Sequence, residues 1–369
     1  MRRARFHLLA LLLALSIAPG RATAQPGGPI AVGSLNLEWF GDSLNPRDPS
    51  EIAALARYIR SLELDVLCCQ EINPSGDRSG DGSPDWGDLL DALGPPFEGF
   101  VGTTGSRQRL GLIWDGGRVA LTDLGELRGI DRLPVRSAET FPRMPITAFV
   151  RPLGGGPDFR LITVHLFWTS DPARRREAEQ LRDWLVSYLS TGSDPDVLIL
   201  GDFNTKALSL DDPRPSQTVA NLELGGWFTA VSTDHPEATT PTTGERYDHA
   251  FLSPSMLLGG AYEPGSWDVR REACEAFPEA YLDRISNHCP VSIRLIGPDL
   301  DLAPPDDWGF GPGDDSPLAR RLAFEAPSAV FPFPMAAVPT PTGPIEPGPR
   351  VAAGPSPPLP SKSLPMPGF

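Results

Sequence analysis

The sequence lacks several features that would place it in a non-globular class. Its 369 residues show no Gly-X-Y period and no sustained heptads, which excludes collagen and coiled coils. Only one long apolar run occurs, so a multi-span membrane protein is excluded as well. Cysteine is scarce, at 4 residues, and Lys+Arg 32 are outnumbered by Asp+Glu 47. The net charge of −15 argues against sequence-independent coating of nucleic acid, although a bound metal ion can supply positive charge locally.

The single apolar run lies at the N-terminus and predicts a signal peptide over residues 1–24. Three arginines among the first five residues precede it, and Ala22-Thr23-Ala24 matches the small-residue pattern that signal peptidase recognises. The run is shorter than the roughly 20 residues that a bilayer span requires. We therefore expect cleavage after Ala24, no stable membrane span and a secreted or periplasmic protein. An uncleaved membrane anchor is the alternative.

Export permits disulfide bonds, and the four cysteines differ in their suitability for one. Cys68 and Cys69 are adjacent in an apolar run typical of a buried strand, which favours free thiols. Cys274 and Cys289 are separated by a short loop that a bridge would close, with a stabilisation of about 3 kcal/mol in the chain-entropy model. We expect a disulfide between these two.

Strand-like apolar runs alternate with helical patterns from residue 25 to 296, which predicts one layered α/β domain. One helix is expected to begin at Pro49 after the cap Asp48, and another to cover residues 174–189. The chain contains 43 prolines, and the segment from residue 297 to 369 is rich in them. We expect this segment to be a disordered tail. The predicted strands cover residues 32–37, 64–70, 110–114, 119–121, 147–151, 160–166, 197–200, 249–253 and 291–296.

Polar side chains recur at the ends of these strands, where layered α/β folds gather their ligand sites. They are Asn36, Glu71, His165, Asp202 with Asn204, Asp248, and His288. Carboxylate and amide oxygens suit a magnesium-like ion, so Glu71, Asn36 and Asp202 are candidate ligands.

The same side chains suit proton transfer and the stabilisation of phosphate charge. Asp202 is placed to take a proton from water, and Asn204, two residues on, to donate to a phosphate oxygen. His165 and His288 are expected to donate to phosphate or to carry protons, with Asp248 fixing the tautomer of His288. Each signal alone is weak: His165 also fits a core histidine, and Gly201-Asp202-Phe203-Asn204 also fits a plain turn.

In their order along the chain, these motifs resemble the endonuclease/exonuclease/phosphatase family, over about residues 30–296. Gln70-Glu71 resembles the family's metal-binding pair, residues 163–166 its histidine strand, and Gly201-Asp202-Phe203-Asn204 is the most specific match. The resemblance implies a deoxyribonuclease I-like four-layered sandwich of the α/β (α+β) class, with two mixed β-sheets packed face to face and flanked by helices. It also implies that Arg143, in Phe141-Pro142-Arg143-Met144-Pro145, contacts substrate phosphate.

One position departs from the family pattern. Ser286-Asn287-His288 replaces the family's usual Ser-Asp-His, so Asn287 still offers an oxygen to a metal but no charge. A catalytically weak or inactive binding protein is therefore one alternative.

The resemblance implies hydrolysis of phosphate esters with Mg2+ or Mn2+, and Ca2+ as a further option. We expect a monomeric secreted nuclease acting on DNA or RNA. A sphingomyelinase-like phospholipid phosphodiesterase and a phosphatase of small phosphate esters remain alternatives, as does a scaffold that displays the Pro-rich tail. Phe167 and Trp168, just past His165, fit membrane contact, stacking on bases or packing at the core edge.

Overall fold

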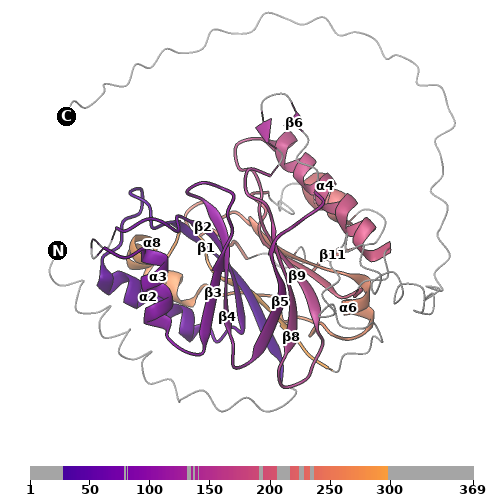
Figure 1. The fold of residues 1–369 in the computed structure, drawn as a ribbon, viewed down its shortest axis with the longest axis horizontal. Helices are drawn as coiled ribbons and strands as arrows, with labels where there is room; N and C mark the ends of the chain where they lie inside the picture. The colour runs from indigo at the N-terminus through magenta and orange to yellow at the C-terminus, as the bar shows by residue number, and fades with distance from the viewer. Residues whose placement is uncertain are drawn as a thin grey trace, which may run out of the picture. The chain divides into compact units, whose positions relative to one another are not determined.

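Two mixed β-sheets of six strands each form the centre of the structure, a computed structural model (Figure 1). In the first sheet the order is β13-β14-β1-β2-β4-β3, with β1 parallel to β2 and antiparallel to β14. In the second the order is β11-β12-β10-β9-β8-β5, with β9 parallel to β10. Each sheet therefore has one central parallel pair whose carboxyl ends lie at the same edge.

The strands of the first sheet are β1 (Ile30–Phe40), β2 (Val66–Ile72), β3 (Phe97–Val101), β4 (Arg109–Asp115), β13 (Asp268–Val269) and β14 (Val291–Leu295). Those of the second are β5 (Val119–Glu126), β8 (Ile146–Pro152), β9 (Phe159–His165), β10 (Val197–Asp202), β11 (Thr229–Ala230) and β12 (Asp248–Leu252). A short ribbon pairs β6 (Pro134–Val135) with β7 (Ala138–Glu139).

The structure describes residues 28–297, except for 79, 81, 131–133, 136–137, 140, 191–193, 206–216, 224–227 and 233–236. The predicted signal peptide, residues 1–24, lies outside the described residues, and so does the predicted tail beyond residue 297. In the described part of the chain, no helix combines the length and the apolar character that crossing a membrane requires.

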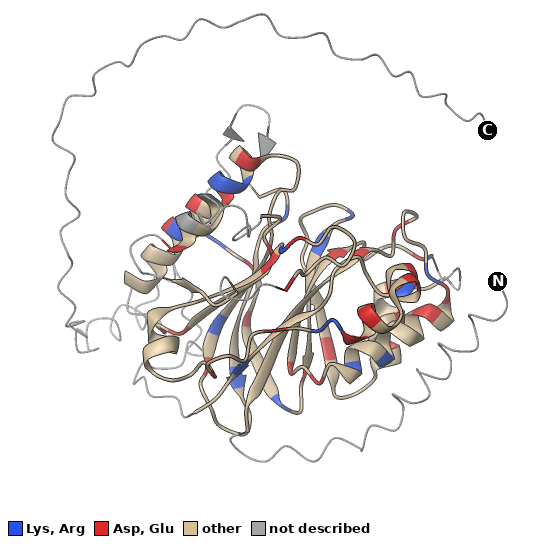
Figure 2. Ribbon diagram, turned by 180° about the vertical axis from the view of Figure 1, so that it is seen from behind, with Lys and Arg blue, Asp and Glu red and all other residues tan. Residues whose placement is uncertain are grey.

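Helices flank both sheets, and the local sequence determines where α2 begins. Asp48 caps α2, accepting from the backbone of Glu51 while the Glu51 side chain accepts from the backbone of Asp48. The apolar side of α2 lies with the first sheet and that of α4 with the second (Figure 1). Acidic and basic residues are mixed along α4 (Figure 2). The helices are α2 (Pro49–Ser61), α3 (Asp85–Leu93), α4 (Asp171–Ser190), α5 (Gln217–Glu223), α6 (Pro254–Leu258), α7 (Glu272–Ala276) and α8 (Pro278–Arg284).

Successive side chains of β9 and of β10 point to opposite faces of the sheet, and the two faces belong to two separate cores. On β9, Leu161 belongs to the core between the sheets, whereas Ile162 and Val164 belong to the core under α4. On β10, Leu198 and Leu200 likewise belong to the core between the sheets. By the same alternation His165 and Asp202 face inward, because each lies an even number of residues from these positions.

The expected four-layered sandwich is confirmed: two mixed sheets lie face to face between layers of helices. All nine predicted strands are present, although β1 and β5 extend three and five residues further at their carboxyl ends, and the predicted helices at Pro49 and 174–189 are α2 and α4. The polar, glycine-rich stretch from Ser75 to Trp86 contains the start of α3, at Asp85.

The predicted disulfide between Cys274 and Cys289 is not present in this structure. Cys274 and Cys289 are free, buried thiols, as are Cys68 and Cys69. Burial raises the pKa of Cys289, and the neighbouring Cys274 thiol, with which it shares a hydrogen bond, raises it further. Cys289 is therefore a protonated thiol.

Candidate active site

The carboxyl ends of the two parallel pairs converge at one edge, between the sheets. Gln70, in β2, donates across the gap from Nε2 to Oγ1 of Thr163 in β9, at 3.4 Å. Asn36, in β1, donates from Nδ2 to Glu71 Oε1 and to Asp202 Oδ2, each at 3.1 Å. These bonds tie residues of four strands to one small volume that is largely shielded from water.

The backbone at this edge of the first sheet is irregular. The register of β1 and β2 shifts between Asn36 and Phe40, and Glu38, Trp39 and Glu71 all adopt positive φ, at 48°, 54° and 61°. Positive φ costs a residue other than glycine of order 1–3 kcal/mol, so such positions persist only where the surroundings enforce them. The irregularity turns Glu71 toward the second sheet, and its Oε2 accepts from the Trp39 backbone at 3.1 Å.

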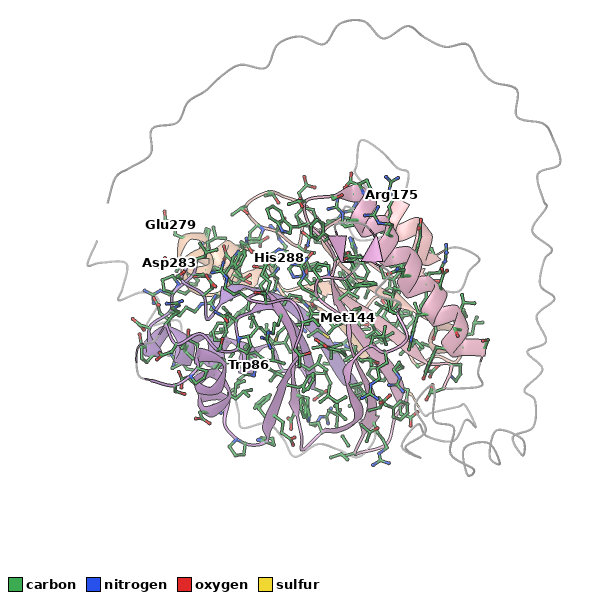
Figure 3. The ribbon with its side chains drawn as sticks, turned by 45° about the horizontal axis from the view of Figure 1, so that its top comes forward. Trp86, Met144, Arg175, Glu279, Asp283 and His288 are labelled. Carbon is green, nitrogen blue, oxygen red and sulfur yellow. The ribbon has the colours of Figure 1, made fainter. Side chains whose placement is uncertain are left out.

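Two carboxylates and two imidazoles meet at the centre of the site. His165 Nε2 lies 3.8 Å from Glu71 Oε1 and 3.6 Å from Asp202 Oδ2. His288 Nε2 lies 3.8 Å from the same Asp202 oxygen. The structure thus brings together the side chains that the sequence placed at four separate strand ends, and Figure 3 shows His288 between the two halves of the molecule.

His288 is held from three directions. Its Nδ1 lies 2.8 Å from Asp248 Oδ2, its backbone N–H donates to Ser286 Oγ, and its carbonyl accepts from Tyr281 Oη at 2.7 Å. Ser286 Oγ in turn donates to the carbonyl of Asn36 at 2.5 Å, which links this turn to β1. Burial alone would lower the pKa of His288, but the charges of Asp248 and Asp202 outweigh it and raise that pKa to about 9. His288 is therefore an imidazolium at neutral pH.

Asp202 and His165 are shifted toward their neutral forms, whereas His288 is shifted toward its charged form. Burial raises the pKa of Asp202 to about 7, although His288 opposes that rise. Burial also holds the pKa of His165 well below its usual value, and Arg143 and His288 lower it further. A carboxylate that titrates near neutrality beside a neutral imidazole is an arrangement suited to proton transfer.

Asn204 and Gly201 shape the turn that follows β10. The Asn204 backbone N–H donates to Asp202 Oδ1 at 2.8 Å, and its Nδ2 donates to the carbonyl of Leu166 at 2.9 Å. Gly201 packs so closely on β9 that a Cβ there would lie 2.2 Å from the Val164 carbonyl oxygen. Only glycine permits this approach, which brings Asp202 beside His165.

Glu38 is a member of the site that the sequence reasoning missed. Its carboxylate accepts from the Asn287 backbone N–H, and the charges of Glu71 and His288 act on it. Burial raises the pKa of Glu38, and its Oε2 is buried without a hydrogen-bond partner among the described residues. The available signal was its position two residues after Asn36, on the same strand.

The oxygen donors present fit a divalent ion of the magnesium type. The described residues contain no ready-made cluster of three or more His, Cys, Asp or Glu side chains for a metal. Mg2+ retains several waters and needs only one or two carboxylates, which Glu71 and the unpartnered Oε2 of Glu38 supply. Asn36 instead orients the carboxylates through Nδ2, while its Oδ1 accepts from the Glu38 backbone at 2.9 Å. Asn287 lies beside Glu38 and brings no charge of its own.

Arg143 lies under the site, where it supports backbone. It is buried, and it donates from Nε to the carbonyl of His165 and from Nη2 to the carbonyl of Leu166, at 3.0 and 3.1 Å. Its Nη1 donates to Gln108 Oε1 at 3.0 Å. All three nitrogens are thus engaged by the protein, and the expected contact with substrate phosphate stays a prediction.

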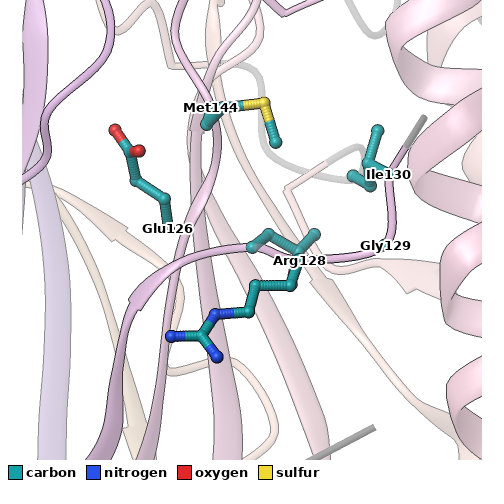
Figure 4. A pocket seen from close by; sticks show the side chains of 6 residues that line it. Glu126, Arg128, Gly129, Ile130 and Met144 are labelled. Atoms are coloured by element: carbon teal, nitrogen blue, oxygen red, sulfur yellow. The ribbon is translucent and has the colours of Figure 1, made fainter. Parts of the chain in front are cut away.

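Two cavities of about 420 Å³ each lie near the start of β8. The first is lined by Glu126, Leu127, Arg128, Gly129, Ile130 and Met144 (Figure 4). The second is formed in part by Arg143, Phe167 and Trp168, so it adjoins the chain just past His165. Glu126 connects the two, because its carboxylate accepts from the backbone and hydroxyl groups of Thr103 and Thr104, which line the second cavity.

Comparison with solved structures places this fold among known ones. An endonuclease/exonuclease/phosphatase from Bacteroides vulgatus aligns with a TM-score of 0.54 at 16% identity, over 73% of this chain and 98% of that one. A mannosyl-6-phosphatase from Bacteroides thetaiotaomicron aligns with 0.51 at 16%, over 73% and 100%. TDP2 from D. rerio, in complex with a single-strand DNA product, aligns with 0.50 at 18%, also over 73% and 100%. At these identities the likeness establishes the fold alone.

Comparison of the sequence with curated proteins finds no match. Comparison with family models finds one, described as the Endonuclease/Exonuclease/phosphatase family, over residues 33–288. The matched segment begins in β1, ends at the histidine that Asp248 holds, and covers more than half of the sequence. The chain belongs to the endonuclease/exonuclease/phosphatase family.

Proposed function

We propose that this chain is an exported, divalent-metal-dependent phosphodiesterase whose substrate is nucleic acid. Family membership supports the hydrolysis of phosphoester bonds. The observation that carries the chemistry is Asp202, whose Oδ2 lies 3.6 Å from His165 Nε2 and 3.8 Å from His288 Nε2. Export rests on the N-terminal sequence, residues 1–24, with cleavage after Ala24.

The residues at the carboxyl ends of the parallel strands have different roles in an in-line hydrolysis. Asp202, with its pKa raised to about 7 by burial, accepts the proton of the attacking water. His288, charged at neutral pH, donates to a phosphate oxygen or gives a proton to the leaving oxygen, and neutral His165 donates from Nε2. A divalent ion held by Glu71 and Glu38 would add positive charge at the phosphate.

The remaining side chains keep these groups in place. Asp248 holds the His288 ring through Nδ1, which leaves Nε2 facing Asp202. Asn204 fixes Asp202 through its backbone N–H and Leu166 through its side chain. Asn36 sets the spacing between Glu71 and Asp202.

A phosphatase acting on small phosphate esters is the second candidate. The excess of acidic over basic residues, with a net charge of −15, disfavours long polyanions and favours a small phosphorylated ligand. A phospholipid substrate has less support, because Trp168 is the one exposed aromatic among the large exposed hydrophobic side chains of the described residues.

The test compares substrates side by side with purified chain lacking residues 1–24. Plasmid DNA, RNA, sphingomyelin vesicles and a sugar phosphate are each incubated with Mg2+ or Mn2+, or with EDTA. We expect metal-dependent cleavage of nucleic acid that is lost in Glu71→Gln and retained in Asp183→Asn, a control on the exposed side of α4. Cleavage of the sugar phosphate alone would favour the phosphatase, and activity unchanged by EDTA would contradict metal dependence.

A further inference from the structure

The segment that follows His165 presents an indole to solvent beside a cavity. Trp168 is 60% exposed, and together with Phe167 it lines a cavity of about 420 Å³. The loop between β3 and β4 contributes Thr103, Thr104, Gly105, Ser106 and Gln108 to the lining, and Pro142 and Arg143 complete it. An exposed aromatic side chain is ordinary when it stands alone, but this one borders a hollow that Arg143 also lines, and Arg143 donates to the carbonyl of His165.

Buried ionic side chains fix the backbone of this segment. Glu177 Oε2 accepts from the Phe167 backbone N–H at 2.7 Å. Arg174 Nη1 donates to the carbonyls of Phe167 and Trp168, at 2.9 and 2.8 Å. Arg143 holds the two preceding carbonyls from below. Every residue from His165 to Trp168 therefore has a backbone group bound by one of three charged side chains, so the indole is carried on a preorganised support.

The loop between β3 and β4 packs closely against Arg143, which holds the segment after His165. Gly105 has a φ of 98°, and a Cβ there would lie 2.8 Å from Arg143 Cγ and 2.8 Å from the Gln108 carbonyl oxygen. Gln108 accepts from Arg143 Nη1, and the Met144 backbone N–H donates to Thr104 Oγ1. Both segments that line the cavity are thus anchored to Arg143 and its neighbours, which makes the hollow a formed feature of the fold.

The lining indicates what the cavity would accept. The lining combines the aromatic residues Phe167 and Trp168 with residues that carry hydroxyl and amide groups, a combination suited to a flat ring with polar edges. Arg107, on the loop between β3 and β4, is 57% exposed, pairs with Asp42 and lies over the Trp39 ring, so it places positive charge on the Glu71 side of this loop.

We propose that this cavity is a nucleobase subsite, in which Trp168 stacks on the base of the nucleotide next to the scissile phosphate. The inference rests on the proposed function and identifies the base as the part of the substrate that this cavity binds. Base stacking on an aromatic side chain tolerates any base, so the subsite contributes affinity without sequence preference.

The kinetic test uses two matched single-strand oligonucleotides, one with a normal base and one with an abasic spacer next to the cleaved bond. On the normal oligonucleotide, we expect Trp168→Ala to raise KM by about 10-fold or more while kcat changes little, and Trp168→Phe to restore most of the affinity. On the abasic oligonucleotide, wild type and Trp168→Ala should have the same KM. Leu153→Ala, 54% exposed beyond the opposite end of β8, is the control and should match wild type on both.

If Trp168→Ala raises KM equally on both oligonucleotides, or raises it on neither, the base assignment is overturned while the proposed nuclease activity stands. A binding measurement covers the case in which neither oligonucleotide is cleaved and the proposed function fails. Titration with a nucleoside monophosphate should quench the fluorescence of wild type but not that of Trp168→Phe. The same quenching in both variants, quenching in neither, or quenching by a sugar phosphate as strong as by the nucleotide would contradict the subsite.

Discussion

Replacing Asp248 by Asn should move the protonation of His288 by more than one pH unit. Asn keeps an oxygen for the 2.8 Å contact with Nδ1 but removes the charge that contributes most to raising this pKa. The wild-type pKa, raised from 6.5 to about 9, corresponds to about 3 kcal/mol of preference for the charged ring. Without Asp248, only Asp202 and Glu71 oppose the effect of burial, so we expect a pKa of about 7 or lower.

The sign of the linked stability follows from the same shift. A histidine whose pKa is higher in the folded state stabilises the protein fully below pH 6.5 and loses that contribution as the pH rises through about 9. In Asp248→Asn this pH dependence should largely disappear. The alkaline limb of the activity profile should shift toward lower pH if His288 must be charged.

The assay is an NMR titration of the histidine rings in metal-free protein, with the His288 signal assigned by its absence in His288→Gln. Asp183→Asn, which removes an exposed charge from α4, serves as the control and should leave the titration unchanged. A His288 signal that still titrates near pH 9 in Asp248→Asn would refute the assignment of Asp248 as the group that charges this ring.

Three further predictions test other parts of the site. Glu38→Gln should weaken Mn2+ binding about 10-fold in calorimetry, whereas an unchanged affinity would remove Glu38 from the metal site. Gly201→Ala should lower the free energy of unfolding in urea by about 3 kcal/mol, because its Cβ would overlap the Val164 carbonyl; a loss below about 1 kcal/mol would mean that the strands separate easily. Burial raises the pKa of Glu177 from 4.5 to about 7, so this group should lower the free energy of unfolding by about 3 kcal/mol as the pH rises between these values. Glu177→Gln should remove that part of the pH dependence in denaturation measured across the range and leave the part due to Asp202, and an unaltered slope would exclude Glu177 as its source.

Much of the architecture could be predicted because the central strands are buried on both faces. Such strands are continuous apolar runs, and the polar residue that ends each run marks the sheet edge, as at Glu71 and Asp202. The parallel pairing of β9 with β10 then places His165 opposite Asp202 in register. These placements depend on local patterns that the sequence displays directly.

The rest depends on tertiary contacts that no local pattern encodes. Glu38 enters the site because the β1 backbone takes positive φ at that residue, which its neighbours impose. The sequence around Arg143 gives no sign that the His165 and Leu166 carbonyls approach its guanidinium, because they come from a different strand. The role of Trp168 likewise depends on the loop between β3 and β4, which is distant from it in sequence.

We expect one divalent cation to bind at Glu71, beside Asp202 and the two histidines. Anomalous diffraction from crystals soaked with Mn2+ tests it most directly, because it locates the ion independently of turnover. We predict a single strong peak in contact with the Glu71 carboxylate, lost in crystals of Glu71→Gln. A peak elsewhere on the chain, or one that persists in Glu71→Gln, would contradict a cation site at Glu71.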